Sequence, residues 1–227
     1  MMELRAEKIS RDFLRYSAKD GYFTAVAETD FTLAAGTLTA VTGRSGSGKS
    51  TLLHILGGLM KPVTGRVLLD ETDIYALGEE ERDALRRCHI GIAPQRLMSL
   101  AALTVRENIL LPALLTGQEE SAAVRADVLM ERLGIRKLAS VAPSELSGGE
   151  LRRVTIARAL VMQPDILLAD EPTGDLDEEN TQSVLSLLRE TADAGAAVLL
   201  VTHESEARNY ADICYTMEAG KLERMTL

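Results

Sequence analysis

The segment GRSGSGKS at residues 43–50 constrains the fold of this chain more than any other part of its sequence. It matches the phosphate-binding loop pattern G-x-x-x-x-G-K-[ST], which requires a strand before it and a helix after it. The apolar run LTAVT (38–42) supplies the strand. We expect the helix to stop at Gly57, Gly58 and Pro62. The apolar stripe of that helix comprises Leu52, Ile55, Leu56 and Leu59.

A loop of this kind binds phosphate through its backbone. Glycines permit tight turns whose successive N–H groups point at phosphate oxygens, and the start of the following helix adds partial positive charge. Lys49 is expected to reach the β- and γ-phosphates of a nucleotide, and Ser50 to bind Mg²⁺. A glycine-rich turn with an exposed lysine is less favoured, because the whole pattern coincides with a strand and a helix. The expected nucleotide-binding residues here are Gly43, Arg44, Ser45, Gly46, Ser47, Gly48, Lys49, Ser50 and Thr51.

Two further apolar runs, DILLAD (165–170) and AAVLLVT (196–202), are continuous rather than alternating. Such runs are typical of strands buried on both faces in a parallel sheet covered by helices. A helical period lies between them and is expected to stop at Gly195. Residues 97–134 show helical patterns with no strand between them. The sequence therefore predicts an α/β fold with a mainly parallel sheet and a helical insertion.

Asp170 and Glu171 lie at the carboxyl end of the second buried strand. In a parallel sheet this end lies beside the loop that follows the first strand, which is where such sheets bind ligands. We expect Asp170 to hold Mg²⁺, and Glu171 to accept a proton from the water that attacks the γ-phosphate, or to orient that water. The alternative is a strand end carrying two solvated acids. No guanine-reading N-K-x-D segment occurs, which disfavours a GTPase.

A second glycine-rich segment, LSGGE (146–150), starts a further helix. Taken alone it predicts an S-x-x-E capping box, and capping would orient the amides that meet phosphate. Three further segments accompany LSGGE: Gln95 in APQ, GDLD (174–177) and His203 in VTH. With these motifs in this order, the chain resembles the ATP-binding subunit of ABC transporters over essentially its whole length. The segments LLHILGGL and DEPTGDLD are most similar to the branch that serves lipoprotein release, macrolide export and cell division.

The resemblance implies a P-loop ABC ATPase fold in one domain, 1–227, with an N-terminal antiparallel β part and a helical subdomain at about 96–153. It implies ATP and Mg²⁺, with Gln95 as a metal and catalytic residue and His203 at the γ-phosphate. Ser147, Gly148 and Gly149 would contact ATP held by a second copy, giving a head-to-tail homodimer. A transmembrane permease would hold the dimer at the inner face of the membrane, through the region around 95–115.

Two features depart from the family's usual pattern. Glu150 stands where Gln is frequent, and Asp175 stands where the branch commonly has Asn, so Asp175 adds charge close to the expected phosphates. The aromatic residue that stacks on adenine is either Tyr16, favoured by its distance from the phosphate loop, or Phe13, favoured by its local sequence.

Two other functions stay open: an ATPase of a cell-division or signalling complex without transport, and a DNA-associated ABC ATPase. An unrelated P-loop kinase is a third.

Composition excludes several other classes. The net charge of −9 makes a broad nucleic-acid-binding face unexpected. No apolar run approaches the roughly 18 residues of a membrane span, and the first ten residues lack the order of a signal peptide, so we expect an intracellular protein. Cys88 and Cys214 are expected to be buried in a reducing interior, and His54 and His89 to bind no metal. A solvated helix face is expected to carry Arg152, Arg153 and Arg158.

Overall fold

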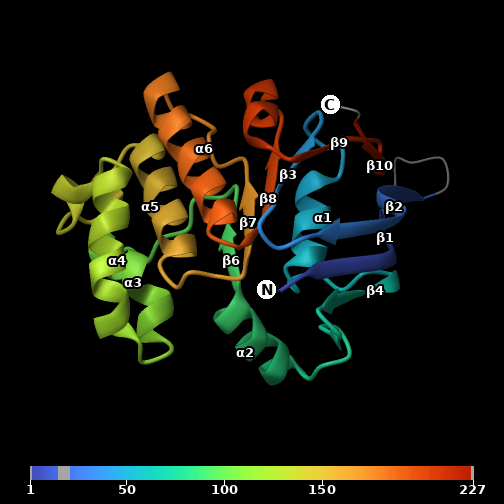
Figure 1. The fold of residues 1–227 in the computed structure, drawn as a ribbon, viewed down its shortest axis with the longest axis horizontal. Helices are drawn as coiled ribbons and strands as arrows, with labels where there is room; N and C mark the ends of the chain where they lie inside the picture. The colour runs from blue at the N-terminus through green and yellow to red at the C-terminus, as the bar shows by residue number, and fades with distance from the viewer. Residues whose placement is uncertain (1, 15–20, 226–227) are drawn as a thin grey trace.

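A mainly parallel sheet forms the centre of the computed structural model, which describes residues 2–14 and 21–225 (Figure 1). Its strand order is β10-β9-β3-β8-β7-β6, and every neighbouring pair is parallel except β10 with β9. The three predicted strands are therefore the adjacent strands β3, β8 and β7. The bounds are β3 (Leu38–Thr42), β6 (Ile90–Ala93), β7 (Ile166–Asp170), β8 (Ala197–Thr202), β9 (Ile213–Glu218) and β10 (Lys221–Arg224).

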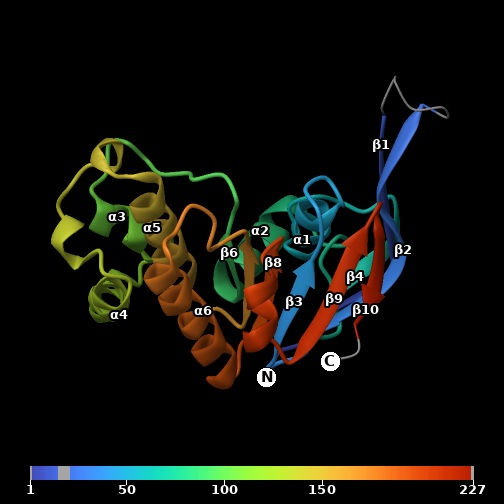
Figure 2. The ribbon, with the colours of Figure 1, turned by 90° about the horizontal axis from the view of Figure 1, so that it is seen from above.

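A second sheet is antiparallel and is built from the N-terminal part of the chain, in the order β2-β1-β4-β5. Together the two sheets confirm the predicted fold class. Figure 2 shows the long β1–β2 hairpin extending away from the parallel sheet. The bounds are β1 (Leu4–Leu14), β2 (Tyr22–Leu33), β4 (Thr64–Leu69) and β5 (Thr72–Asp73).

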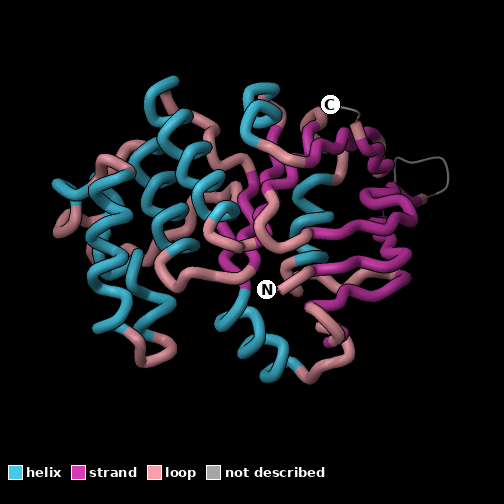
Figure 3. The backbone as a smooth tube through the Cα atoms, in the orientation of Figure 1, coloured by secondary structure: helices cyan, strands magenta, loops and turns pink. Residues whose placement is uncertain are grey.

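Helices cover the parallel sheet on both sides (Figure 3). Helix α1 lies between the two sheets, whereas α3, α4, α5 and α6 gather at the other side (Figures 1 and 2). The segment predicted to be helical without strands holds α3 and α4. The bounds are α1 (Lys49–Leu56), α2 (Glu79–His89), α3 (Val105–Leu114), α4 (Glu119–Arg132), α5 (Gly148–Leu160) and α6 (Glu178–Asp193), with short 3₁₀ turns at Arg136–Leu138, Pro143–Glu145 and Ser205–Tyr210.

Strand β7 shows why its sequence is continuously apolar. Ile166 and Leu168 pack in the core on the side of α1, while Leu167 and Ala169 pack in the core with the helices of the other side. All four are at most 1% exposed. Because successive side chains of a strand point to opposite faces, burial of both faces requires an apolar residue at every position.

Two expectations about burial are wrong. Helix α1 ends at Leu56, and Gly58 takes a left-handed φ of 70°, so the chain turns away and leaves Leu59 50% exposed instead of on the helix stripe. Cys88 is exposed because its helix, α2, buries none of its residues, whereas Cys214 is buried as predicted.

Neither histidine discussed above forms part of a metal cluster within residues 2–14 and 21–225. His54 is half-buried, and His89 Nδ1 lies 2.8 Å from Asp165 Oδ2. Over the same residues, no group of three or more His, Cys, Asp or Glu could hold a metal by itself, and no helix is long and apolar enough to cross a membrane.

Candidate nucleotide-binding site

The phosphate loop connects β3 to α1 and is wedged between two other strands. Gly48 caps α1 with a φ of 110°, and a Cβ there would lie 1.9 Å from the carbonyl oxygen of Ala25 in β2. A Cβ on Gly43 would lie 2.3 Å from the carbonyl oxygen of Met217 in β9. The two glycines are therefore required by close backbone packing, and at Gly48 by the left-handed φ as well.

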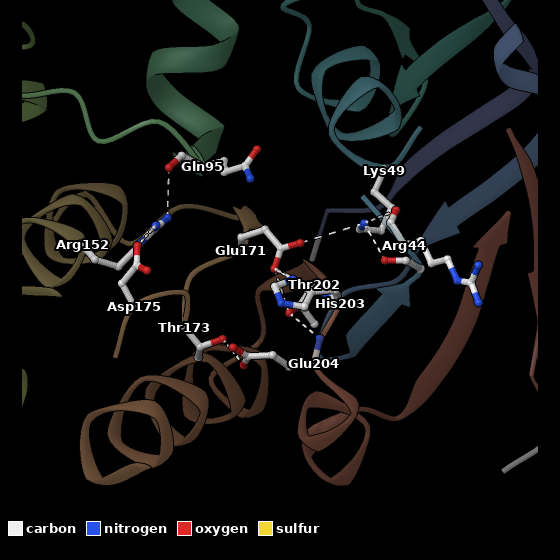
Figure 4. A network of polar contacts seen from close by, with 11 residues as sticks. Arg44, Lys49, Gln95, Arg152, Glu171, Thr173, Asp175, Thr202, His203 and Glu204 are labelled. Carbon is white, nitrogen blue, oxygen red and sulfur yellow. Dashed lines mark hydrogen bonds and ion pairs between the residues drawn. The ribbon is translucent and has the colours of Figure 1, made fainter. Parts of the chain in front are cut away.

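Lys49 points into this loop. It is 5% exposed, and its Nζ donates hydrogen bonds to the carbonyl oxygens of Gly43 at 2.8 Å and Arg44 at 3.1 Å. The same ammonium lies 3.9 Å from Glu171 Oε1 (Figure 4). A buried positive charge is thus held between the phosphate loop and the end of β7.

Asp170 ends β7 and is 2% exposed, and its Oδ1 has no hydrogen-bond partner. Burial raises the pKa of this carboxyl group; a hydrogen bond from Ser50 lowers the pKa, and the charge of Glu171 raises it. A buried, unpartnered carboxylate oxygen beside a hydroxyl matches the oxygen ligands that Mg²⁺ prefers. Asp170 and Ser50 therefore fit the cation that the sequence predicts.

Glu171 is held in place through both its backbone and its side-chain carboxylate. Its backbone takes a φ of 49°, unusual for a residue with a Cβ, and its N–H donates to the carbonyl oxygen of Val201 at 2.8 Å. Its Oε2 accepts hydrogen bonds from Thr202 Oγ1 at 3.1 Å and from the His203 N–H at 3.3 Å, and lies 2.9 Å from His203 Nδ1. Backbone strain of this kind persists where the surroundings enforce it, often at active sites.

A cavity of about 200 Å³ is lined by residues of the phosphate loop and by Glu171, whereas Asp170 and His203 do not line it. Gln95, which is exposed and follows β6, lines it opposite the phosphate loop. Phe13 also lines it, while the Arg11 guanidinium lies 5.0 Å from the centre of the Phe13 ring. The competing residue, Tyr16, lies outside the described residues. The remaining lining residues are Phe23, Ala25, Ser45, Gly46, Gly48, Lys49, Ser50, Thr51 and Glu171.

The segment LSGGE forms the N-terminus of α5, and its predicted capping box is confirmed. Ser147 Oγ accepts a hydrogen bond from the Glu150 N–H, and Glu150 Oε2 accepts from the Ser147 N–H at 2.8 Å. The Ser147 backbone hydrogen bond lowers the pKa of the Glu150 carboxyl. Ser147, Gly148 and Gly149 line a separate cavity of about 330 Å³. Among the residues the structure describes, this cavity shares no lining residue with the phosphate-loop cavity.

The expectation that the three arginines of α5 form a solvated face is wrong. Arg152 is 7% exposed, and Arg153 hydrogen-bonds Asn180 Oδ1. Arg158 is half-buried, and burial lowers its pKa. The reason is that α5 packs against α3, α4, β6 and β7, which leaves little of its surface to water.

Sequence reasoning missed three residues that support the site. Thr202 donates to Glu171, as described above. Thr173 Oγ1 donates to Glu204 Oε2 at 2.5 Å and so joins the loop after Glu171 to the segment after His203 (Figure 4). Thr173, Thr202 and Glu204 each stand within two residues of a predicted site residue. This proximity in the sequence is the feature that could have indicated their supporting role.

A parallel sheet whose strand ends carry a phosphate loop, a buried Asp170 and a strained Glu171 defines a P-loop nucleotide hydrolase. The family model described as ABC transporter matches residues 26–174, and the chain belongs to that family. The resemblance seen in the sequence is thereby confirmed, together with ATP and Mg²⁺ as ligands and ATP hydrolysis as the activity.

Individual relatives agree with this assignment. The lipoprotein-releasing system ATP-binding protein LolD of Shewanella oneidensis is 39% identical, over 97% of this chain and 95% of the relative. The macrolide export ATP-binding/permease protein MacB of Shewanella sp. (strain W3-18-1) is 38% identical, over 94% of this chain but 33% of the relative. A solved dimeric ATP-binding cassette in a post-hydrolysis state with ADP and Pi is 27% identical, covers 99% of both chains and has a TM-score of 0.88.

Proposed function

We propose that this chain is the ATP-hydrolysing subunit of a membrane transporter, and that it dimerises head to tail around two ATP molecules. The observation that supports the dimer is that the two glycine-rich segments line two different cavities. The phosphate loop and LSGGE (146–150) line different cavities that share no lining residue among the described residues, which favours ATP sites in which the two segments come from different copies. A two-fold symmetric pair, in which each ATP lies between the phosphate loop of one copy and the LSGGE segment of the other, then closes with two equal ATP sites.

We propose the following roles within each site. Lys49 holds the terminal phosphates, and Ser50, Asp170 and Gln95 hold Mg²⁺, which when bound neutralises phosphate charge. Glu171 accepts the proton of the attacking water, and His203, 2.9 Å from Glu171, contacts the γ-phosphate. Phe13 or Tyr16 stacks on adenine.

We further propose that the helical part, about 96–153 of the single domain 1–227, transmits the ATP cycle to a transmembrane permease. The region 95–115 is the contact with this partner, because it starts at the ATP cavity and carries apolar side chains facing water. The exposed apolar residues of this region include Met98 (65%), Leu100 (50%), Leu114 (45%) and Leu115 (66%). The protein is then peripheral on the inner face of the membrane, in a complex of the exporter or mechanotransmission type.

The names of the relatives favour transport over the other functions considered. They concern lipoprotein release and macrolide export, so an apolar or lipidated cargo handled by the permease is the corresponding proposal here. A DNA-associated ABC ATPase would carry a long coiled coil between Ser50 and Leu146. The helices of that fully described interval have only 11, 10 and 14 residues, and no such coiled coil is present in it.

The first test is the oligomeric state of the isolated chain. We expect the isolated chain to be a weak or modest ATPase. Without nucleotide it should be a monomer, because two faces of a chain with a net charge of −9 repel until Mg·ATP bridges them. Addition of Mg·ATP should produce a dimer in light scattering. A stable dimer at low salt without nucleotide would contradict this picture.

The second test concerns the partner contact. Changing Met98 and Leu115 together to Glu should abolish co-purification of the permease in mild detergent, because charges replace apolar side chains at the contact. The basal ATPase of the isolated chain should stay within about twofold of wild type, since both side chains face water. Val63→Glu is the matched control, at a residue 58% exposed in the N-terminal part of the chain. Equal loss of the permease with the control would refute the contact.

A further inference from the structure

Arg152 is a buried cation at the point where three functional segments meet. It lies in α5, five residues after the N-cap residue Ser147, and only 7% of it is exposed. Its Nη1 donates a hydrogen bond to the backbone carbonyl oxygen of Gln95 at 3.0 Å. Its Nη2 lies 3.7 Å from Asp175 Oδ2. Figure 4 shows the guanidinium between the Gln95 backbone and Asp175, with the Gln95 side-chain amide on the far side of its backbone.

The charge of Arg152 requires these two contacts. A guanidinium stays protonated in proteins, and burying it is costly unless it is paired. Asp175 Oδ2 is the only carboxylate oxygen within ion-pair distance of it among residues 2–14 and 21–225. Its Nε has no partner among the same residues. The neutral Gln95 carbonyl and the Asp175 carboxylate therefore stabilise the buried charge of Arg152.

The loop that contains Asp175 is shaped to present this carboxylate. Asp175 has a φ of 64°, a left-handed conformation that Asp adopts more readily than most residues. A Cβ on the preceding Gly174 would lie 3.5 Å from Arg152 Nη2, so this loop packs directly on the guanidinium. The Asp175 side chain is 80% exposed, so the ion pair contributes little to the stability of the fold.

We propose that Arg152 is a positioning residue that ties the Gln95 loop and the Asp175 loop to the helix starting at LSGGE, with Asp175 as its counter-ion. This inference rests on the proposed function, because all three segments contribute to the ATP sites there. It gives the unexpected acid at position 175 a role that is neither phosphate binding nor proton transfer. Arg152 itself lines neither of the two cavities.

A double-mutant cycle tests whether the pair acts as a unit. We expect Arg152→Gln to lower kcat about tenfold and Asp175→Asn to lower it severalfold, with binding of a fluorescent ATP analogue within twofold of wild type, since the phosphate loop is untouched. The double variant should be no slower than Arg152→Gln, because a neutral Gln and Asn can again hydrogen-bond. Additive losses would overturn the proposal.

Hydrogen exchange supplies a readout that does not depend on activity. In Arg152→Gln, amides of residues 95–98 and 173–176 should both exchange faster than in wild type. Arg158→Gln is the matched control, because Arg158 lies on the same helix and, among the described residues, forms no hydrogen bond or ion pair with either loop, unlike Arg152. Faster exchange in one loop only, or in neither, would overturn the proposal. If the wild-type protein hydrolyses no ATP, the proposed function fails, whereas the exchange experiment still decides the role of Arg152.

Discussion

Glu171→Gln should accumulate as an ATP-bound dimer that hydrolyses ATP about 10²–10⁴-fold more slowly than wild type, the usual loss when a general base is removed. Gln keeps the shape of Glu and can still accept the hydrogen bonds from Thr202 Oγ1 and the His203 N–H. It does not accept a proton at neutral pH. Lys49, Asp170 and the opposing LSGGE segment stay in place, so binding and chemistry should separate.

The readouts are phosphate release and size exclusion in the presence of ATP with Mg²⁺ or Na⁺. Removal of one carboxylate per copy also reduces like-charge repulsion between two acidic faces, which favours the dimer. Asp175→Asn is the comparison, because Asp175 is another acid close to Glu171 in the chain and is paired with Arg152. If Glu171→Gln hydrolysed ATP at close to the wild-type rate while Asp175→Asn trapped the dimer, the assignment of the base would be wrong.

Features encoded by neighbouring residues could be predicted from the sequence. The strands β3, β7 and β8 are apolar at nearly every position because both of their faces are buried, and this is visible without knowledge of their partners. The capping box of Ser147 and Glu150 closes within four residues, as does the turn of α6 into Gly195, which has a φ of 111°. Local patterns of this kind place the phosphate loop and Asp170 correctly.

Features that depend on distant contacts could not be predicted. Arg152 is separated by 57 residues from the carbonyl that it binds, so the pattern of α5 gave no sign that its charge is buried. The phosphate-loop pattern predicts a glycine at position 43, but the close approach of Met217, far along the chain, is not visible in the sequence. The exposure of Cys88 follows from the position of α2 outside the core, which a short amphipathic pattern does not determine.

Mixing Lys49→Ala with Ser147→Arg should restore ATP hydrolysis that neither variant shows alone. Lys49→Ala removes the buried ammonium that lies 3.9 Å from Glu171 Oε1, and should abolish ATP binding or hydrolysis. Ser147→Arg places a bulky cation in the cavity of the LSGGE segment, and should leave binding intact while blocking dimerisation and hydrolysis. Ser147→Ala is its control, because it removes the hydroxyl, and with it a helix cap worth typically about 1 kcal/mol, without adding a bulky cation.

The reason for recovery is the head-to-tail arrangement. In a mixed dimer, one site combines the intact phosphate loop of the Ser147→Arg chain with the intact LSGGE segment of the Lys49→Ala chain, while the other site carries both defects. About half of the dimers in an equal mixture are mixed, and each has one complete site of two, so recovery of up to about a quarter of wild-type activity is expected for a two-fold symmetric pair with shared sites. If phosphate release stayed at background at every mixing ratio, each chain would have to complete its own site, and the two separate cavities would need another explanation.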